Sequence, residues 1–201
     1  MTYSFFYSNI LSMKTLILAS NNKGKLEEIR AILKDRFKVL SLSDCKISAD
    51  IEETRATFEE NALIKPKAVY RMTGLPVISD DSGLEVYALD GAPGVYSARF
   101  AGDEHDDEKN NEKLLNLMKG KDNRDAAFVC CAVFYDGSRA VSAEGRAEGK
   151  ILEKKDGDNG FGYDPLFYSY DLNKSFGCAS FEEKNSVSHR ARAFSALAEK
   201  L

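Results

Sequence analysis

Two adjacent carboxylates, Asp80 and Asp81, follow a short apolar run at the point where a strand is expected to end, and they precede a Ser-Gly pair. Burying carboxylates beside an apolar strand costs free energy unless a cation shares the site. That cation could be a metal ion, a lysine or both. The alternative interpretation is an ordinary surface turn, in which Asp, Ser and Gly are common. The choice depends on where the chain supplies positive charge.

Lysines occur at two places from which they can reach such a site. Lys23 and Lys25 lie in the polar segment 20–25, between an apolar run and a helical pattern. Backbone N–H groups at a helix start bind phosphate, and lysines add charge, although the spacing is not that of a Walker A loop. Lys65 stands in an otherwise apolar helical stripe, so it either extends to solvent or reaches the acidic pair.

A second acidic pair, Glu52 and Glu53, lies in an irregular stretch that can approach Asp80 and Asp81. Carboxylates from separate loops commonly hold Mg²⁺, which prefers oxygen ligands and shares them with phosphates. A solvated acidic loop is the alternative interpretation. The sequence therefore allows a magnesium site without establishing one.

Aromatic and cationic residues near the C-terminal end suit a nucleobase. Segment 161–164 (Phe-Gly-Tyr-Asp) offers rings that can stack on a base and a carboxylate that can read its edge. Lys184, His189 and Arg190 precede a helical pattern. The alternatives are a core-filling turn and an ordinary helix-capping region.

The elements expected to position these residues alternate between strand and helix, which predicts an α/β fold. The apolar run 15–19 indicates a buried strand, and the apolar spacing over 26–33 indicates a helix with Glu28 on its outer, charged face. A second helix begins near Thr57, at a capping-box pattern. Pro66 should kink or restart that helix because proline lacks a backbone donor.

Length and composition favour one globular domain. The chain has 201 residues, of which 43% are hydrophobic, and a formal net charge of −4. This length can bury a core on both faces of a sheet. An acidic balance provides no basic face for nucleic acid, and no run is long enough to span a membrane. We therefore predict neither a nucleic-acid nor a membrane partner.

Cysteine usage and the N-terminal segment suggest the compartment and the domain boundary. Four cysteines occur without a Cys-x-x-Cys motif and alongside two histidines, which does not favour zinc and suits a reducing cytoplasm. Residues 1–12 lack the basic start and long apolar stretch of a signal peptide. We expect 1–13 to be an N-terminal extension and 14–201 to be a single domain.

The order of these polar motifs resembles the inosine triphosphate pyrophosphatase family, the Ham1-like proteins, over essentially all of residues 14–201. The motifs that carry the resemblance are 20–25 (SNNKGK), 57–62 (TFEENA), 79–84 (SDDSGL), 91–100 (GAPGVYSARF), 160–165 (GFGYDP) and 188–190 (SHR). Each motif is weak alone, but their combination is specific.

The resemblance implies an elongated mixed β-sheet with flanking helices and two lobes around a central cleft, commonly assembled as a homodimer. It also implies Mg²⁺-dependent hydrolysis of the non-standard purine nucleotides ITP, dITP and XTP to the monophosphate and pyrophosphate, which removes them from the nucleotide pool. The sequence does not rank the three substrates.

By the same resemblance, Asp81 is the general base and a metal ligand, and Asp80 supports it. Lys65 faces the phosphates. A further metal ligand falls at Glu52 or Glu53, with Glu53 slightly favoured. This assignment is chemically coherent because the cations neutralise the triphosphate while a carboxylate directs water at the α-phosphorus.

Substrate binding is implied for two further groups of residues. The phosphate end comprises Ser20, Asn21, Asn22, Lys23, Gly24, Lys25 and Ser82. The wall that recognises the base comprises Phe161, Gly162, Tyr163, Asp164, Lys184, His189 and Arg190. Donors such as Arg190 can bind the 6-oxo group of hypoxanthine or xanthine, whereas the amino group of adenine would leave them unpaired.

Two other classes of function compete with this one. A nucleotide sensor without turnover should lack one of the acids or lysines, and the sequence lacks none of them. A single-stranded nucleic-acid-binding module could use the aromatic loop, but the net charge argues against it.

Overall fold

A computed structural model describes residues 13–47, 57–102 and 104–201. Within these residues the strands form one seven-stranded mixed sheet in the order β2-β1-β3-β4-β5-β6-β7. The strands are β1 (Lys14–Leu18), β2 (Phe37–Leu40), β3 (Val77–Val86), β4 (Asp125–Tyr135), β5 (Ala140–Ile151), β6 (Phe167–Ser169) and β7 (Lys174–Ser175). β1 pairs in parallel with β2 and β3, whereas the pairings from β3 to β7 are antiparallel.

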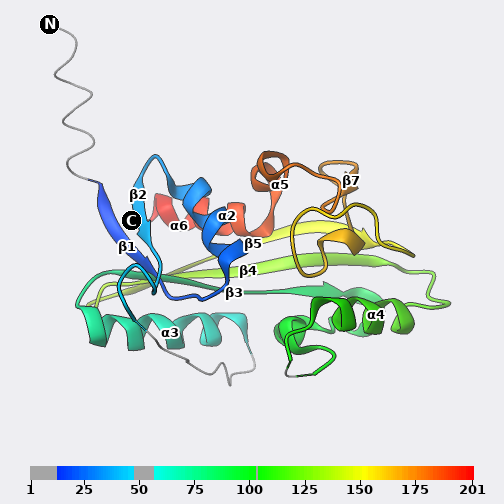
Figure 1. Cartoon of the computed structure of the whole chain (residues 1–201), viewed down its shortest axis with the longest axis horizontal. Coiled ribbons are helices and arrows are strands. Elements are labelled where there is room, and N and C mark those ends of the chain that lie inside the picture. The colour runs from blue at the N-terminus through cyan, green and yellow to red at the C-terminus, as the bar shows by residue number, and fades with distance from the viewer. Residues whose placement is uncertain (1–12, 48–56, 103) are drawn as a thin grey trace, which may run out of the picture.

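Helices cover both faces of this sheet (Figure 1). They are α2 (Lys23–Leu33), α3 (Phe58–Thr73), α4 (Asp107–Leu117), α5 (Phe181–Val187) and α6 (His189–Glu199). α2, α5 and α6 lie on one face and α3 and α4 on the other, so the long strands β3, β4 and β5 run through the middle of an elongated molecule. The expected α/β fold with a mixed sheet is confirmed. Among the described residues, no helix has the length and apolarity to cross a membrane.

The acidic pair lies inside β3 and not in a turn at its end. The strand continues to Val86 and pairs with β4 throughout, with Asp80 opposite Ala132 and Asp81 opposite Cys131. The predicted strand end at the acidic pair is therefore wrong. Neighbouring side chains on a strand point to opposite faces of the sheet. The two carboxylates consequently belong to different faces.

Polar residues on β3 separate two apolar cores. On one face of the strand, Ile78 packs in a cluster with α2 and α6, and Leu84 packs in another with Phe128 of β4 and the 163–176 segment. Strand alternation places Asp80 and Ser82 between them on that face. The hydrophobic side chains therefore divide into two clusters on either side of a polar band.

α3 continues through Pro66 from Phe58 to Thr73. The predicted start is confirmed, because the Thr57 hydroxyl caps the helix by accepting a hydrogen bond of 3.2 Å from the backbone N–H of Glu60. The predicted restart at Pro66 is wrong. In a regular helix the Ala62 carbonyl would accept a hydrogen bond from the backbone N–H of residue 66, which proline lacks. The Ser79 hydroxyl donates to this carbonyl instead, so the carbonyl keeps a hydrogen-bond donor.

Candidate active site

A cleft at this polar band contains most of the predicted site residues. Its lining comprises Asn22, Lys25, Asp81, Ser82, Gly83, Val95, Ser97, Ala98, Arg99, His105, Asp107, Phe128, Phe161, Gly162, Tyr163, Asp164, Lys184, His189 and Arg190. The predicted residues that do not line it are Ser20, Asn21, Lys23, Gly24 and Lys65. Glu52 and Glu53 lie outside the described residues.

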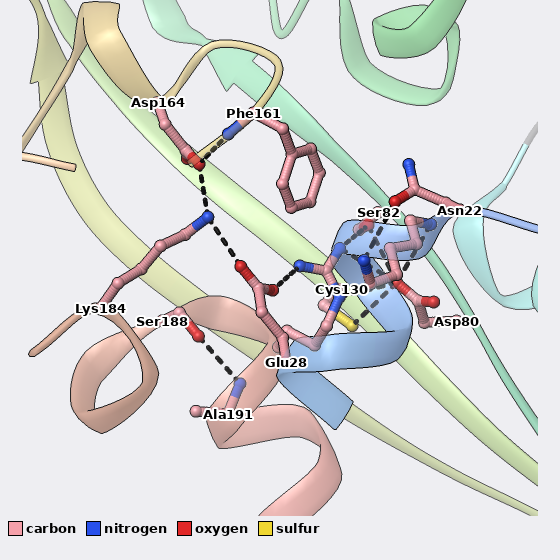
Figure 2. A network of polar contacts seen from close by, with 12 residues as sticks. Asn22, Glu28, Asp80, Ser82, Cys130, Phe161, Asp164, Lys184, Ser188 and Ala191 are labelled. Atoms are coloured by element: carbon pink, nitrogen blue, oxygen red, sulfur yellow. Dashed lines mark hydrogen bonds and ion pairs between the residues drawn. The ribbon is translucent and has the colours of Figure 1, made fainter. Parts of the chain in front are cut away.

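Asp80 lies at the centre of a buried network of charges beneath the cleft (Figure 2). Its Oδ2 lies 3.1 Å from Lys25 Nζ and accepts hydrogen bonds of 3.2 Å from Nε and Nη2 of Arg190. The Ser82 hydroxyl donates to the same oxygen at 3.0 Å. Burial alone would raise the pKa of Asp80, but Lys25 and Arg190 hold that pKa well below its ordinary value. Asp80 is therefore an ionised anchor for two cations.

Glu28 extends this network, although the sequence placed it on the outer face of its helix. Glu28 is only 3% exposed. Its Oε2 accepts a hydrogen bond of 2.5 Å from Arg190 Nη1, and its Oε1 lies 2.8 Å from Lys184 Nζ. Burial opposes ionisation, but Arg190 and Lys184 outweigh it and lower the pKa of Glu28. Glu28 follows Lys25 by three residues, so both lie on the same side of α2. This spacing is the feature of the sequence that indicates a shared position for the two residues.

Lys184 joins the network to the aromatic loop. Figure 2 shows its amino group between Asp164 and Glu28, and Nζ lies 2.5 Å from Asp164 Oδ2. The same carboxylate oxygen accepts from the backbone N–H of Phe161 at 2.8 Å. Burial raises the pKa of Asp164 against the opposing effect of Lys184. The Phe161 ring centroid lies 4.7 Å from Lys184 Nζ, so the ring is held over a cation.

The aromatic loop is also held from the opposite side of the cleft. The backbone N–H of Gly162 donates to Asp107 Oδ2 at 2.8 Å, and its carbonyl accepts from Asn111 Nδ2 at 3.0 Å. The Tyr163 hydroxyl donates to the Ser97 carbonyl at 2.8 Å. No local pattern in the sequence indicates Asp107 or Asn111, because both lie about fifty residues from the loop and meet it only through tertiary packing.

His189 is a buried, neutral side chain in the cleft wall. Its ring stacks on Phe128 with centroids 4.8 Å apart and an interplanar angle of 12°. Burial, reinforced by Arg190 and Lys184, lowers the pKa of His189 well below its ordinary value. Among the described residues, Nδ1 has no hydrogen-bond partner. The imidazole therefore offers polarity without charge.

The predicted phosphate turn forms the start of α2. Asn22 caps the helix by accepting from the backbone N–H of Lys25 at 3.0 Å, and the Ser20 hydroxyl accepts from the backbone N–H of Asn22 at 3.2 Å. A helix N-terminus with a nearby lysine suits an anion. Gly24 lies against the aromatic loop, because a Cβ built there would be 2.7 Å from Cδ1 of Phe161.

Asp81 belongs to the other face of the sheet, where α3 packs. It is 6% exposed and lines the cleft. Alternation along β3 places it on the same face as Ser79, whose hydroxyl contacts the Ala62 carbonyl of α3. Lys65 is half-buried and follows Ala62 by three residues, within the same turn of that helix. The two predicted catalytic residues therefore lie on packed neighbouring elements, although Lys65 does not line the cleft.

The sequence matches the Ham1 family over residues 16–200. The chain belongs to the Ham1 family. The "dITP/XTP pyrophosphatase" of Clostridium perfringens is 46% identical over 199 residues, which cover 94% of this chain and 98% of that protein. The protein of the same name from Desulforamulus reducens is 47% identical over 182 residues, 89% of this chain and 90% of that protein.

Solved Ham1 structures share this fold. The Staphylococcus aureus Ham1 protein superposes with a TM-score of 0.83 at 42% identity and covers 93% of this chain and 97% of its own. The Coxiella burnetii HAM1 protein superposes with a TM-score of 0.84 at 36% identity, and the match covers 94% of this chain and 98% of that protein. The predicted family is therefore confirmed.

The described part of this Ham1 protein supplies the kind of oxygen donor that Mg²⁺ prefers. Asp81 contributes carboxylate oxygens to the cleft. Mg²⁺ bound with a substrate phosphate needs only one or two protein carboxylates. The described residues contain no group of three or more metal-binding side chains. The predicted ligands Glu52 and Glu53 lie outside the described residues.

Proposed function

We propose that this Ham1 family protein hydrolyses dITP, XTP and ITP to the corresponding monophosphate and pyrophosphate, and so removes them from the nucleotide pool. One observation carries the proposal. A single cleft is lined both by Asn22 and Lys25 of a helix N-terminus and by Phe161, whose ring lies over Lys184. A helix N-terminus with a lysine suits phosphates and an aromatic ring suits a base, so this one cleft offers both kinds of contact that a nucleoside triphosphate needs. The printed names of the relatives support the same substrates.

The phosphates lie, in this proposal, at the start of α2 and against β3. The N-terminal N–H groups of the helix and Lys25 attract the charge, and Lys65 approaches from α3. Asp80 fixes Lys25 by an ion pair of 3.1 Å, so the lysine is held before the substrate arrives. Such preorganised charge stabilises a phosphoryl-transfer transition state without reorganisation during the reaction.

Asp81 directs the attacking water. It accepts a proton from water as the oxygen bonds to the α-phosphorus, and the bond from that phosphorus to the bridging oxygen of pyrophosphate breaks. Asp81, with Glu52 or Glu53, would hold Mg²⁺. When bound, this ion neutralises phosphate charge and stabilises the leaving group.

The aromatic part of the cleft selects the base. Phe161 stacks on the purine, and Arg190 and His189, which line the same cleft, offer polar groups to its 6-position. A 6-oxo group accepts a hydrogen bond from such donors, whereas the 6-amino group of adenine leaves them unpaired. A site built for hydrogen bonding rejects a mismatched group strongly. The buried Nδ1 of His189, which has no partner among the described residues, supports this role.

A substrate panel tests the proposal. The purified protein with Mg²⁺ is given dITP, XTP, ITP, dATP and dGTP, and pyrophosphate and orthophosphate are measured separately. We expect pyrophosphate to be released from dITP, XTP and ITP. We expect kcat/KM for dATP to be at least about tenfold lower than for dITP. Release of orthophosphate alone, or equal rates for dITP and dATP, contradicts the proposal.

We also infer a cytoplasmic homodimer. All four cysteines are free thiols, which suits a reducing compartment. The dimer follows from the family resemblance, and sedimentation equilibrium of the full chain measures it directly. A mass of 22.3 kDa in solution corresponds to the monomer and contradicts the dimer.

A further inference from the structure

One buried hydroxyl replaces a hydrogen bond that Pro66 removes from α3. In a helix the Ala62 carbonyl accepts from the backbone N–H of residue 66, four positions later. Pro66 has no N–H. The Ser79 side chain, which is fully buried, donates its hydroxyl to the Ala62 carbonyl instead. The donor therefore comes from a strand and not from the helix itself.

This hydrogen bond joins the two elements that carry the proposed catalytic residues. Ser79 precedes Asp81 by two residues on β3, so both side chains leave the same face of the sheet. Lys65 lies within the turn from Ala62 to Pro66, the turn that lacks its own helical bond. The Ser79 hydroxyl therefore connects the turn that bears Lys65 to the strand that bears Asp81.

We propose that Ser79 is a positioning residue that sets the place of Lys65 relative to Asp81. The proposal rests on the proposed function. Without the hydroxyl, the Ala62 carbonyl is buried without a donor, because Pro66 cannot supply one. The Lys65 turn can then shift from the strand. A displacement of about 1 Å in a catalytic group can cost about a hundredfold in rate.

The first experiment uses Pro66 to separate the hydrogen bond from the serine itself. Wild type, S79A, P66A and the double variant S79A/P66A are compared in kcat and KM for dITP with Mg²⁺. We expect S79A to lower kcat by about tenfold or more with a smaller change in KM. We expect S79A/P66A to recover most of that loss, because Ala at position 66 restores the helical N–H to the Ala62 carbonyl. P66A alone should remain near wild type.

A matched control lies on the same helix. The Thr73 hydroxyl donates to the Val69 carbonyl at 3.0 Å, remote from the Lys65 turn. Thr73→Val removes that hydroxyl at constant shape and should keep the wild-type kcat. A thermal melt of each variant establishes that it is folded at the assay temperature. If S79A is insoluble, S79C takes its place, since its thiol is a weaker donor of similar size.

The second experiment asks whether Ser79 acts through Lys65. In a Lys65→Met background, the S79A change should cost little further kcat, because a group that positions Lys65 has nothing left to position. If Ser79 had only a structural role, the reductions in kcat caused by S79A and by Lys65→Met would multiply in the double variant. Full multiplication overturns the proposal, as does wild-type kcat in folded S79A or a double variant S79A/P66A no faster than S79A.

Different results would overturn the proposed function and the role of Ser79. If wild type releases no pyrophosphate from dITP, the proposed function is wrong and the positioning role falls with it. If wild type is active and S79A keeps its kcat, only the role of Ser79 is wrong.

Discussion

Lys25 and Asp80 form an ion pair of 3.1 Å that joins the first turn of α2 to the middle of β3. Arg190, from the start of α6, shares the same carboxylate oxygen. Asp80 thus connects the anion-binding helix start to the wall proposed to recognise the base. Asp81, its neighbour, belongs to the opposite face and carries the proposed chemistry. The two adjacent acids therefore have different tasks.

Asp80→Asn should destabilise the fold. The change leaves Lys25 and the buried Arg190 without their shared counterion, and breaking a buried pair from one side costs about 3 kcal/mol. Urea unfolding followed by circular dichroism measures the free energy of unfolding. Asp44→Asn is the control, because Asp44 pairs with Arg30 at 2.6 Å on the surface and both side chains are 44% exposed. Its loss should be much smaller than that of Asp80→Asn, because a solvent-exposed ion pair contributes little, and equal losses in the two variants would contradict the anchoring role.

Asp81→Asn should stop turnover and keep nucleotide binding. An amide cannot take the proton from water, so kcat should fall at least about a hundredfold. Calorimetric titration with dITP should still detect binding, because the phosphate and base contacts lie on other residues. Asp35→Asn, an exposed carboxylate change, should leave kcat unchanged. A D81N enzyme at full rate would show that another group is the base.

Stability should depend on pH through His189. Its pKa is lowered well below the ordinary value in the folded protein, chiefly by burial. Below about pH 6.5 the unfolded state therefore binds a proton that the folded state does not. The free energy of unfolding should fall as the pH drops from 6.5 to 5, by up to about 1.4 kcal/mol per pH unit.

The contribution of His189 is isolated by His189→Gln. Unfolding in urea at several pH values between 5 and 7 should give a flatter dependence for H189Q than for wild type. Identical slopes in the two proteins would mean that His189 takes up its proton equally in both states.

Gly24→Ala should weaken substrate binding more than it slows chemistry. The added Cβ would lie 2.7 Å from Cδ1 of Phe161, so the ring must move. A displaced ring stacks less well on the base, and we expect KM for dITP to rise about threefold to tenfold with a smaller change in kcat. Lys34→Ala, an exposed change at the C-terminal end of α2, is the control for effects on the helix. A G24A enzyme with wild-type KM would show that the Gly24–Phe161 contact is unimportant for binding.

The sequence predicted the elements well where local signals agree. The strand at 15–19, the cap at Thr57 and the alternation that separates Asp80 from Asp81 all depend on neighbours in the chain. Cap chemistry and strand alternation are local properties, so they can be read without knowing the fold.

Residues that act through tertiary contacts were harder to find. Glu28 looked like a surface charge because its partners, Lys184 and Arg190, lie more than 150 residues away. Local composition predicts that the strand ends at Asp80, because it cannot show that distant cations neutralise this carboxylate. Pro66 predicts a kinked or restarted helix, and only the fold reveals the Ser79 hydroxyl that replaces the missing donor.

Hydrolysis of dITP in water labelled with ¹⁸O, with mass spectrometry of both products, tests the proposed reaction most directly. We expect dIMP and pyrophosphate in equal amounts, with the label in dIMP, because water attacks the α-phosphorus. Label in pyrophosphate, or release of dIDP and orthophosphate, would contradict it.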